Sequence, residues 1–477
     1  MRKIENIITV IVLSFTLLSC GSWLEVEPQN DITLDDFWKS KEDIRSALTS
    51  GYNQIRDEAP TMLVWGEVRA DMVADGPGNH GDFEKVMRLE ILPGNSINQW
   101  LGMYKIINYA NTVIKYAPTV RKSDLSLGVR DLNSFLAEAK FQRALAYFYL
   151  VRTFRDVPLY LEPVDTDNVD IFLPKSDEAD ILAQIIEDLE WAERYAPRGF
   201  SEVEYNKGFG TKAVIQALLA DVYLWDGQFD NCVTMCNKII DRSAYRILDS
   251  ESFGEIFGRG NTNEGILELQ FDATKNQKNK FWNLYSTGGK NGLAFIVPPH
   301  VEEAYDESDK RKLTTVYRNS KDVLMVNKFD VFGNSISEDA NWIVYRYADI
   351  LLMKAEALVN TGDYFGAQNE LNIIRDRAGL GPKILSENRF EAEDAILAER
   401  GLEFAYEGKR WFDLLRVARR NNFERKETLI NILTRNIDPA KAPKYRSLLS
   451  DPMSYYLPIW QKELENNVNL VQNPYYE

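Results

Sequence analysis

The strongest constraint on the fold is a pattern of apolar residues that describes two helices joined by a tight turn. Within residues 344–377, apolar residues recur at helical spacing, the run stops at Gly362, and a second helical pattern resumes beyond Tyr364. The sequence therefore predicts a helix, a turn and an antiparallel helix. The apolar positions are Ala348, Leu351, Leu352, Ala355 and Leu358 before the turn, and Ala367, Leu371 and Ile374 after it.

A second copy of this hairpin lies earlier in the chain. Setting Gly227 on Gly362, an offset of 362 − 227 = 135, places Ala220 on Ala355 and matches the aromatic residue two positions after each glycine. A helix pair with alanine near the crossing and Gly-x-aromatic at the turn resembles a tetratricopeptide repeat. Helix pairs are predicted near residues 34–118, 136–197, 211–241 and 345–380.

The remaining segments predict loops with a few short strands. Residues 245–340 carry the apolar pieces ILELQFDAT, LAFIVPP and DVLMVNKFD among Gly- and Asn-rich loops, which is typical of short strands. Because long stretches of sequence separate the hairpins, we do not expect them to form a simple repeat array. We expect this variable region to pack against the hairpins. Residues 65–94 and the chain after Arg420 are expected to be mostly irregular. The predicted fold is mainly α, with one domain over residues 34–477.

Acids and arginines are concentrated just after the second hairpin. Glu399, Glu403 and Glu407 would share one face of a long helix, where like charges cost about 0.2–0.5 kcal/mol per pair. One interpretation is a glycosidase, whose two carboxylates flank the scissile bond. The preferred interpretation is an ion-pair network, because guanidinium groups bind carboxylates in a forked geometry. Its predicted members are Glu399, Glu403, Glu407 and Asp413 with Arg346, Arg375, Arg377, Arg400, Arg410 and Arg416.

Composition limits the chemistry that the chain can carry. A net charge of −16 argues against a nucleic-acid partner, which needs clustered Lys and Arg on one face. Two histidines, His80 and His300, and three cysteines leave little material for histidine-based catalysis or a Cys/His metal site. Cys232 and Cys236 stand four residues apart on a predicted helix, and we expect buried thiols there. No metal and no cofactor are therefore expected.

The amino terminus has the features of a lipoprotein leader. Two basic residues precede an apolar run over residues 7–18, which is too short to span a bilayer comfortably. The run ends in Leu-Leu-Ser-Cys-Gly, which looks like a bacterial lipobox. Residues 1–19 are predicted to be a signal peptide, and acylation of Cys20 would anchor residues 20–33 as a membrane tether. Ser22 stands where aspartate would indicate inner-membrane retention, so an outer-membrane location is favoured.

Two loops carry aromatic residues that a helical scaffold does not need. One contains the sequence FWNLYSTGGKNG, and the other follows the segment WGEVRADMV. Aromatic rings stack on the C–H faces of sugars, while amide and carboxylate groups hydrogen-bond sugar hydroxyls. The same rings would alternatively anchor the loops on the core. The predicted ligand-binding residues are Trp282, Tyr285, Asn283, Asp75, Asn79, His80 and Phe83, with Trp282 foremost.

Several segments, in order over nearly the whole chain, resemble the SusD/RagB family of Bacteroidetes nutrient-binding lipoproteins. They are the lipobox cysteine, LEVEPQNDITLDDFWKS, WGEVRADMV, AEAKFQRALAYFYLVRTFRDVPL, ERGLEFAYEGKRWFDLLR and the ending YYLPIWQKELENNVNLVQNPYY. The resemblance implies a cell-surface lipoprotein, lipidated at Cys20, whose tetratricopeptide-like helices pack against a variable loop-rich region. It also implies a protein without enzymatic activity that caps a SusC-like TonB-dependent outer-membrane transporter and binds a glycan, or in some members a peptide, for import.

Three functional hypotheses follow from the sequence. The first is a glycan-binding surface lipoprotein, the second a helical glycoside hydrolase using two of the three glutamates, and the third a periplasm-facing scaffold for protein partners. Helical hairpins alone serve any of these roles. The loop aromatics and the family resemblance favour the first.

Overall fold

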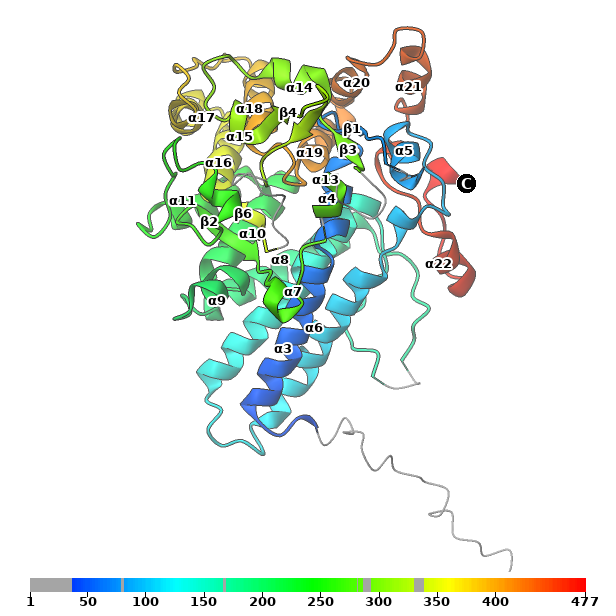
Figure 1. The fold of residues 1–477 in the computed structure, drawn as a ribbon. Helices are drawn as coiled ribbons and strands as arrows, with labels where there is room; N and C mark the ends of the chain where they lie inside the picture. The colour runs from blue at the N-terminus through cyan, green and yellow to red at the C-terminus, as the bar shows by residue number, and fades with distance from the viewer. Residues whose placement is uncertain (1–36, 79–80, 166–168, 281, 286–292, 330–338) are drawn as a thin grey trace, which may run out of the picture. The chain divides into compact units, whose positions relative to one another are not determined.

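The computed structural model describes residues 37–78, 81–165, 169–280, 282–285, 293–329 and 339–477. Residues 40–477 form one compact unit, which is mainly helical as predicted (Figure 1). Its longer helices are α3 (Lys41–Asp57), α4 (Ala59–Glu67), α6 (Leu101–Val120), α7 (Val129–Phe154), α8 (Glu178–Tyr195), α10 (Lys212–Trp225), α11 (Phe229–Ile240), α16 (Tyr347–Thr361), α17 (Tyr364–Arg377), α18 (Arg389–Glu403), α19 (Arg410–Phe423) and α20 (Lys426–Thr434).

Shorter elements connect these helices. The short helices are α5 (Gly81–Met87), α9 (Val203–Gly208), α12 (Glu255–Gly258), α13 (Trp282–Tyr285), α14 (Pro299–Ala304), α15 (Lys312–Thr315), α21 (Ala442–Leu448) and α22 (Gln461–Asn466). The strands are β1 (Ala74–Asp75), β2 (Gly265–Leu269), β3 (Phe295–Ile296), β4 (Val316–Arg318), β5 (Leu324–Val326) and β6 (Trp342–Arg346). They pair antiparallel as β1 with β3, β2 with β6 and β4 with β5.

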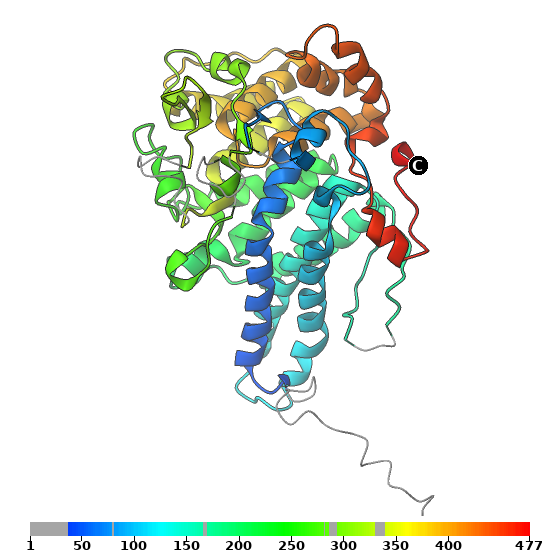
Figure 2. The same ribbon diagram turned by 45° about the vertical axis from the view of Figure 1, so that its right-hand side comes forward.

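The helices pack in pairs, and the pairs stack on one another. Helices α3 and α6, α7 and α8, α10 and α11, and α16 and α17 form the four predicted pairs. Contacts between α6 and α7, α8 and α10, and α11 and α16 then join each pair to the next. Figures 1 and 2 show α3 beside α6 in both views. The expectation that the hairpins form no array was therefore wrong, because the long segment between α11 and α16 does not separate these two helices.

Glycine in the left-handed conformation marks the turn of both sequence-related hairpins. Gly362 ends α16 with φ +87°, and Gly227 follows α10 with φ +78°. The carboxylate of Asp363 then accepts a hydrogen bond from the Gly366 amide at 2.8 Å, which begins α17. Glycine adopts positive φ without a steric cost, so the repeated glycine in the sequence identifies these turns correctly.

The predicted long helix through the three glutamates is interrupted. Helix α18 ends at Glu403 and α19 begins at Arg410. Between them Tyr406 and Gly408 have φ values of +69° and +71°, which a helix does not allow. The buried Glu67 carboxyl group accepts hydrogen bonds from the amides of Tyr406 (3.3 Å) and Gly408 (3.0 Å). Hydrogen bonds to a side chain of α4, which is distant in sequence, therefore stabilise this turn.

Other element boundaries also differ from the sequence prediction. The three predicted extended pieces contain β2, β3 and β5, but β1, β4 and β6 were not predicted. Strand β6 is buried along its whole length and shows no alternation, and its last two residues fall within the predicted helix pair over 345–380. Residues 65–94 include the end of α4 and all of α5, and the chain after Arg420 includes α20, α21 and α22. These short helices depend on tertiary packing and leave a weak periodic signal.

Arg346 is the centre of a buried ion-pair network. Its Nη1 atom lies 2.6 Å from a Glu403 oxygen and 2.7 Å from Glu264, and its Nη2 atom lies 2.9 Å from Glu407. Arg311, which the sequence analysis did not identify, lies 2.9 Å from the second Glu403 oxygen. All five side chains are almost wholly removed from solvent. Buried charges at these distances stabilise the fold only as a complete set.

The predicted acid–arginine network is confirmed with one exception. Arg346, Arg375, Arg377, Arg400 and Arg416 each pair with one or more of the predicted acids. Arg410 pairs instead with Asp71, its Nε atom lying 2.8 Å from a carboxylate oxygen. Residue Asp71 comes from the segment just before β1, so this pair ties the network to one of the predicted ligand loops.

The network also determines the protonation of its acids. Burial alone would raise the pKa of Glu403, but the charges of Arg377, Arg346 and Arg311 outweigh it and hold the pKa well below its usual range. Burial is likewise outweighed at Glu407, whose pKa is lowered chiefly by Arg346. A glycosidase acid needs a raised pKa to keep its proton near neutral pH. These two carboxyl groups do not meet that requirement.

We expect Glu403→Ala to lower the free energy of unfolding by about 3–5 kcal/mol, because it leaves buried guanidinium groups without their carboxylate. Chemical denaturation followed by circular dichroism measures the change. The control is Glu391→Ala, an exposed acid on the same helix, which should cost less than about 1 kcal/mol. A Glu403→Ala protein as stable as the control would contradict a structural role for the network.

Candidate functional site

One of the two loops predicted to bind ligand pairs with the strand that directly follows the other. Strand β1, from the loop after Arg69, pairs with β3 from the variable region, with Ala74 opposite Ile296. The pairing continues beyond the strands, because the Gly76 amide donates to the Ala294 carbonyl at 2.8 Å. Segments more than two hundred residues apart in sequence thus form one surface.

Glycine permits the close approach of the two loops. A Cβ atom on Gly76 would lie 2.4 Å from the Leu293 carbonyl oxygen, well inside van der Waals contact. On the other side of the junction, the Phe83 ring of α5 packs on Phe295 of β3, with ring centroids 5.3 Å apart. The junction therefore combines backbone pairing with an aromatic contact.

A cleft of about 420 Å³ lies beside this junction. One wall is apolar and includes Trp65, Phe83 of the first loop and Leu284 of α13. Polar side chains from α3, α4 and α6 also line the cleft, and the exposed Lys105 and Lys280 stand among the lining residues. Apolar surface beside hydrogen-bonding groups is the usual composition of a small-molecule site. The remaining lining residues are Gln54, Glu58, Pro60, Thr61, Val64, Ser96, Ile97, Gln99, Leu101 and Gly102.

The polar side of the cleft is a connected row. Gln54 Nε2 donates to Glu58 Oε1 at 3.0 Å, and Thr61 Oγ1 donates to Glu58 Oε2 at 2.8 Å. The Glu58 carboxylate lies directly against Gly102 of α6, where a Cβ atom would come within 1.9 Å of it. The row presents hydroxyl, amide and carboxylate groups with fixed positions. Such groups suit a ligand that is rich in hydroxyls.

Among the predicted ligand residues whose side chains the structure describes, Phe83 lines this cleft. Phe83 is half-buried and lines the apolar wall. Asp75 is exposed on β1, opposite Phe295. The backbones of Trp282 and Asn283 form the start of α13, next to Leu284 of the cleft wall, while their side chains lie outside what the structure describes, as do Asn79, His80 and Cys20.

Tyr285 is a core residue, which corrects its predicted role as a stacking surface. Its side chain is 1% exposed and lies against Phe295, Phe329 and Tyr406, with centroid distances of 5.9–6.0 Å. Burial raises the pKa of the Tyr285 hydroxyl well above its ordinary value. No face of the ring is open to a sugar. Tyr285 anchors α13 on the core, which was the alternative interpretation of the loop aromatics.

The polar row of the cleft was missed by the sequence analysis. Gln54, Glu58 and Thr61 are ordinary residues for exposed positions of helices, and nothing in their spacing indicates a binding site. The only signal is Gly102, a glycine in the first turn of a helix without a turn to explain it. Such a glycine often marks the close approach of another group, which here is the Glu58 carboxylate.

The described residues offer little for metal chemistry. Cys232 and Cys236 are buried free thiols, as predicted, and burial raises the pKa of Cys232 well above its ordinary value. Within the described ranges, no three or more His, Cys, Asp or Glu side chains are grouped so that they would hold a metal ion. No helix in the same ranges is long and apolar enough to cross a membrane.

Family models match both ends of this chain. The model described as the SusD family matches residues 300–476, and the model described as starch-binding associating with outer membrane matches residues 22–224. The chain belongs to the SusD/RagB family. The residues between the two matches include most of the variable region, from which β3 and α13 of the candidate site come.

Relatives of this SusD/RagB chain align along most of its length. A SusD-like protein of Formosa agariphila is 28% identical over 476 residues, covering 87% of this chain and 92% of the relative. Among solved structures, a SusD superfamily protein from Bacteroides vulgatus has a TM-score of 0.79 at 23% identity and covers 92% of this chain and 100% of that one. A laminarin binding SusD-like protein has a TM-score of 0.73 at 23% identity, covering 91% and 99%. The stacked helical pairs are therefore the SusD fold.

The junction of the two loops can be tested through its glycine. We expect Gly76→Ala to break the pairing with residues 293–294, because the added Cβ would meet the Leu293 carbonyl oxygen. The loss of two backbone hydrogen bonds, from Gly76 and Gly78, should weaken local stability by about 1–3 kcal/mol. Hydrogen–deuterium exchange of peptides that cover residues 74–78 measures this change.

The control for Gly76→Ala is Gly81→Ala, where an added Cβ meets nothing within 4 Å. The control should leave exchange over residues 74–78 unchanged. Equal exchange in the two variants would show that the junction of β1 and β3 does not hold the loops together.

Proposed function

We propose that this protein is a lipid-anchored surface protein of the outer membrane that binds a glycan and delivers it to a SusC-like TonB-dependent transporter. The observation that carries the proposal is the pairing of β1, in the first predicted ligand loop, with β3, which follows the second predicted loop in sequence. Phe83 and Leu284, which flank this pairing in the chain, line one cleft. A binding protein for long, varied ligands needs such a surface, built from loops on a rigid helical frame.

The chemistry of the cleft supports a carbohydrate ligand. Its apolar wall suits the C–H face of a sugar ring, and the row from Gln54 to Thr61 offers donors and acceptors for hydroxyls. The description of one matching family model as starch-binding, and the name of the laminarin binding neighbour, support the same class of ligand.

Within the site we assign the principal stacking role to Trp282, at the start of α13. Asn283, Asp75, Asn79 and His80 are proposed to hydrogen-bond sugar hydroxyls. Phe83 contributes to the apolar wall, because its ring is half-exposed and held by Phe295. Tyr285 supports these residues from the core.

The proposal does not include catalysis. A hydrolase would need two carboxyl groups facing a bound sugar, and Glu399, Glu403 and Glu407 are buried and paired with cations. Release of reducing sugar by the purified protein would contradict this part of the proposal. Binding of peptides, with no glycan bound, would favour the peptide-binding alternative within the family.

The Trp282→Ala variant tests the proposed site. In native gels that contain starch, laminarin or other soluble polysaccharides, a recognised glycan retards the wild-type protein. We expect Trp282→Ala to lower the affinity by about tenfold, because a sugar–aromatic stack is worth on the order of 1 kcal/mol or more. Phe365→Ala, which removes a ring 73% exposed on α17, is the control and should bind as the wild type does. Full retardation of Trp282→Ala would refute the assignment.

The lipid anchor is tested separately at Cys20. In cells fed a labelled fatty acid, the wild-type protein should carry the label and fractionate with the outer membrane, while Cys20→Ser should do neither, since the acyl chains provide the membrane attachment. Protease accessibility on intact cells reports surface exposure. A Cys20→Ser protein that stays labelled and membrane-bound would contradict the anchor.

A further inference from the structure

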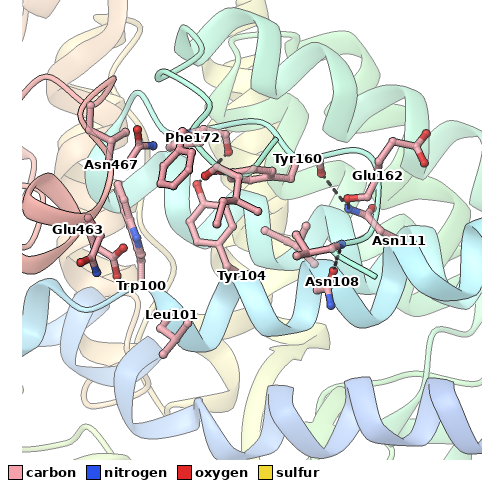
Figure 3. A pocket seen from close by; sticks show the side chains of 16 residues that line it. Trp100, Leu101, Tyr104, Asn108, Asn111, Tyr160, Glu162, Phe172, Glu463 and Asn467 are labelled. Atoms are coloured by element: carbon pink, nitrogen blue, oxygen red, sulfur yellow. Dashed lines mark hydrogen bonds between the residues drawn. The ribbon is translucent and has the colours of Figure 1, made fainter. Parts of the chain in front are cut away.

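A second cavity, separate from the glycan cleft, lies between α6, the segment after α7 and the C-terminal segment. It has a volume of about 320 Å³, within the range of small-molecule sites. Figure 3 shows the rings of Trp100, Tyr104, Tyr160 and Phe172 gathered along it. Among the described residues that line either cavity, the two share only Leu101. The glycan proposal makes no use of this second cavity.

Hydrogen bonds hold the walls of the cavity in place. The Tyr104 hydroxyl donates to the Pro158 carbonyl at 2.9 Å, and the Tyr160 hydroxyl donates to the Ile171 carbonyl at 2.6 Å. On the C-terminal side, Asn467 Nδ2 donates to the Leu173 carbonyl at 2.9 Å. Both ends of the segment that follows α7 are thus fastened to other elements. The rings are arranged before any ligand arrives, which reduces the entropy lost on binding.

Two amides on α6 hold the segment that follows α7. Asn111 Nδ2 donates to the Tyr160 carbonyl at 3.0 Å, and Asn108 Oδ1 accepts from the Val164 amide at 2.7 Å. The strongest remaining polar groups are the carboxylates of Glu463 and Glu162. They lie at opposite ends of the row of rings, with Glu463 beside Trp100 (Figure 3).

The charge in the cavity is one-sided. None of the described residues that line it is a lysine or an arginine. The guanidinium group of Arg143 reaches Asn111 at 2.9 Å, but it is buried and bound by Asp188 at 2.7 and 2.8 Å. Lys115, near the other end of α6, lies 2.7 Å from Asp165. The Glu463 carboxyl group is partly buried, and this burial raises its pKa. A hydrogen bond from the Trp100 side chain acts in the opposite direction but does not cancel the effect.

We propose that this cavity binds an alkylammonium group, with the cation over the rings of Tyr104, Tyr160 and Phe172 and paired with Glu463. Aromatic faces carry negative potential and attract cations, most strongly where water is excluded. A carboxylate at the end of the row adds a direct charge partner. A neutral ligand of the same shape would gain the apolar contact but neither electrostatic contribution.

Choline and its neutral isostere 3,3-dimethylbutan-1-ol separate these contributions. They have the same shape and differ in charge, so titration calorimetry with the full-length protein measures the effect of the cation alone. We expect choline to bind about tenfold more tightly than the alcohol. Equal affinities, or no binding of choline, would overturn the proposal.

Variants locate the site of binding. Glu463→Gln should reduce the preference for choline to the part that the aromatic rings supply, while keeping the shape of the cavity. Glu465→Gln, which changes an exposed acid on the same helix, should leave the preference unchanged. Phe172→Leu, which removes a ring 46% exposed, should weaken choline binding without unfolding the protein. Thermal melting verifies that each variant is folded. A preference for choline that is undiminished by Glu463→Gln in a folded protein would overturn the assignment. Leu284, two residues after Trp282, lines the glycan cleft and is not among the described residues that line this cavity, so Trp282→Ala tests the glycan proposal independently.

Discussion

The Arg346 guanidinium group is completely buried, and it is tolerated there because Glu264, Glu403 and Glu407 surround it at 2.6–2.9 Å. These acids come from the start of β2, the end of α18 and the turn that follows α18. Arg311 and Lys328 add contacts from the variable region, with Lys328 Nζ lying 2.6 Å from Glu407. Charges in the interior are stable only when all partners are present, so the helical pairs and the variable region must assemble together.

The same part of the molecule positions the proposed glycan site. Glu67, at the end of α4, accepts hydrogen bonds from two backbone amides of the turn between α18 and α19. Burial raises the pKa of Glu67 to about 8, although these hydrogen bonds act to lower it. Four residues later, Asp71 pairs with Arg410 at 2.8 Å, and its carbonyl oxygen lies 2.8 Å from a ring nitrogen of His300. Strand β1 begins three residues beyond Asp71. The ligand loop therefore starts from a fixed point of the frame, and its pairing with β3 completes the site.

The sequence was sufficient to predict the elements with strong local signals. The repeated glycine identified the hairpin turns, and the density of acids and arginines indicated the network before its geometry was known. Predictions failed where a distant group decides the local structure. Glu67 ends the helix after Glu403, and surrounding rings bury Tyr285, which local sequence cannot reveal. The two ligand loops were predicted, but the polar row of the cleft depends on the packing of α3 against α6, which a single sequence does not show.

The central claim is that glycan binds where the two loops meet, on a frame that stays unchanged. Hydrogen–deuterium exchange of the whole protein, with and without a polysaccharide that retards it in gels, tests this claim most directly. We expect the polysaccharide to slow the exchange of backbone amides in residues 74–85 and 282–297, and to leave the exchange of α16, α18 and α19 unchanged. Protection confined to residues 156–176 and 461–470 would place the glycan in the second cavity and contradict the account.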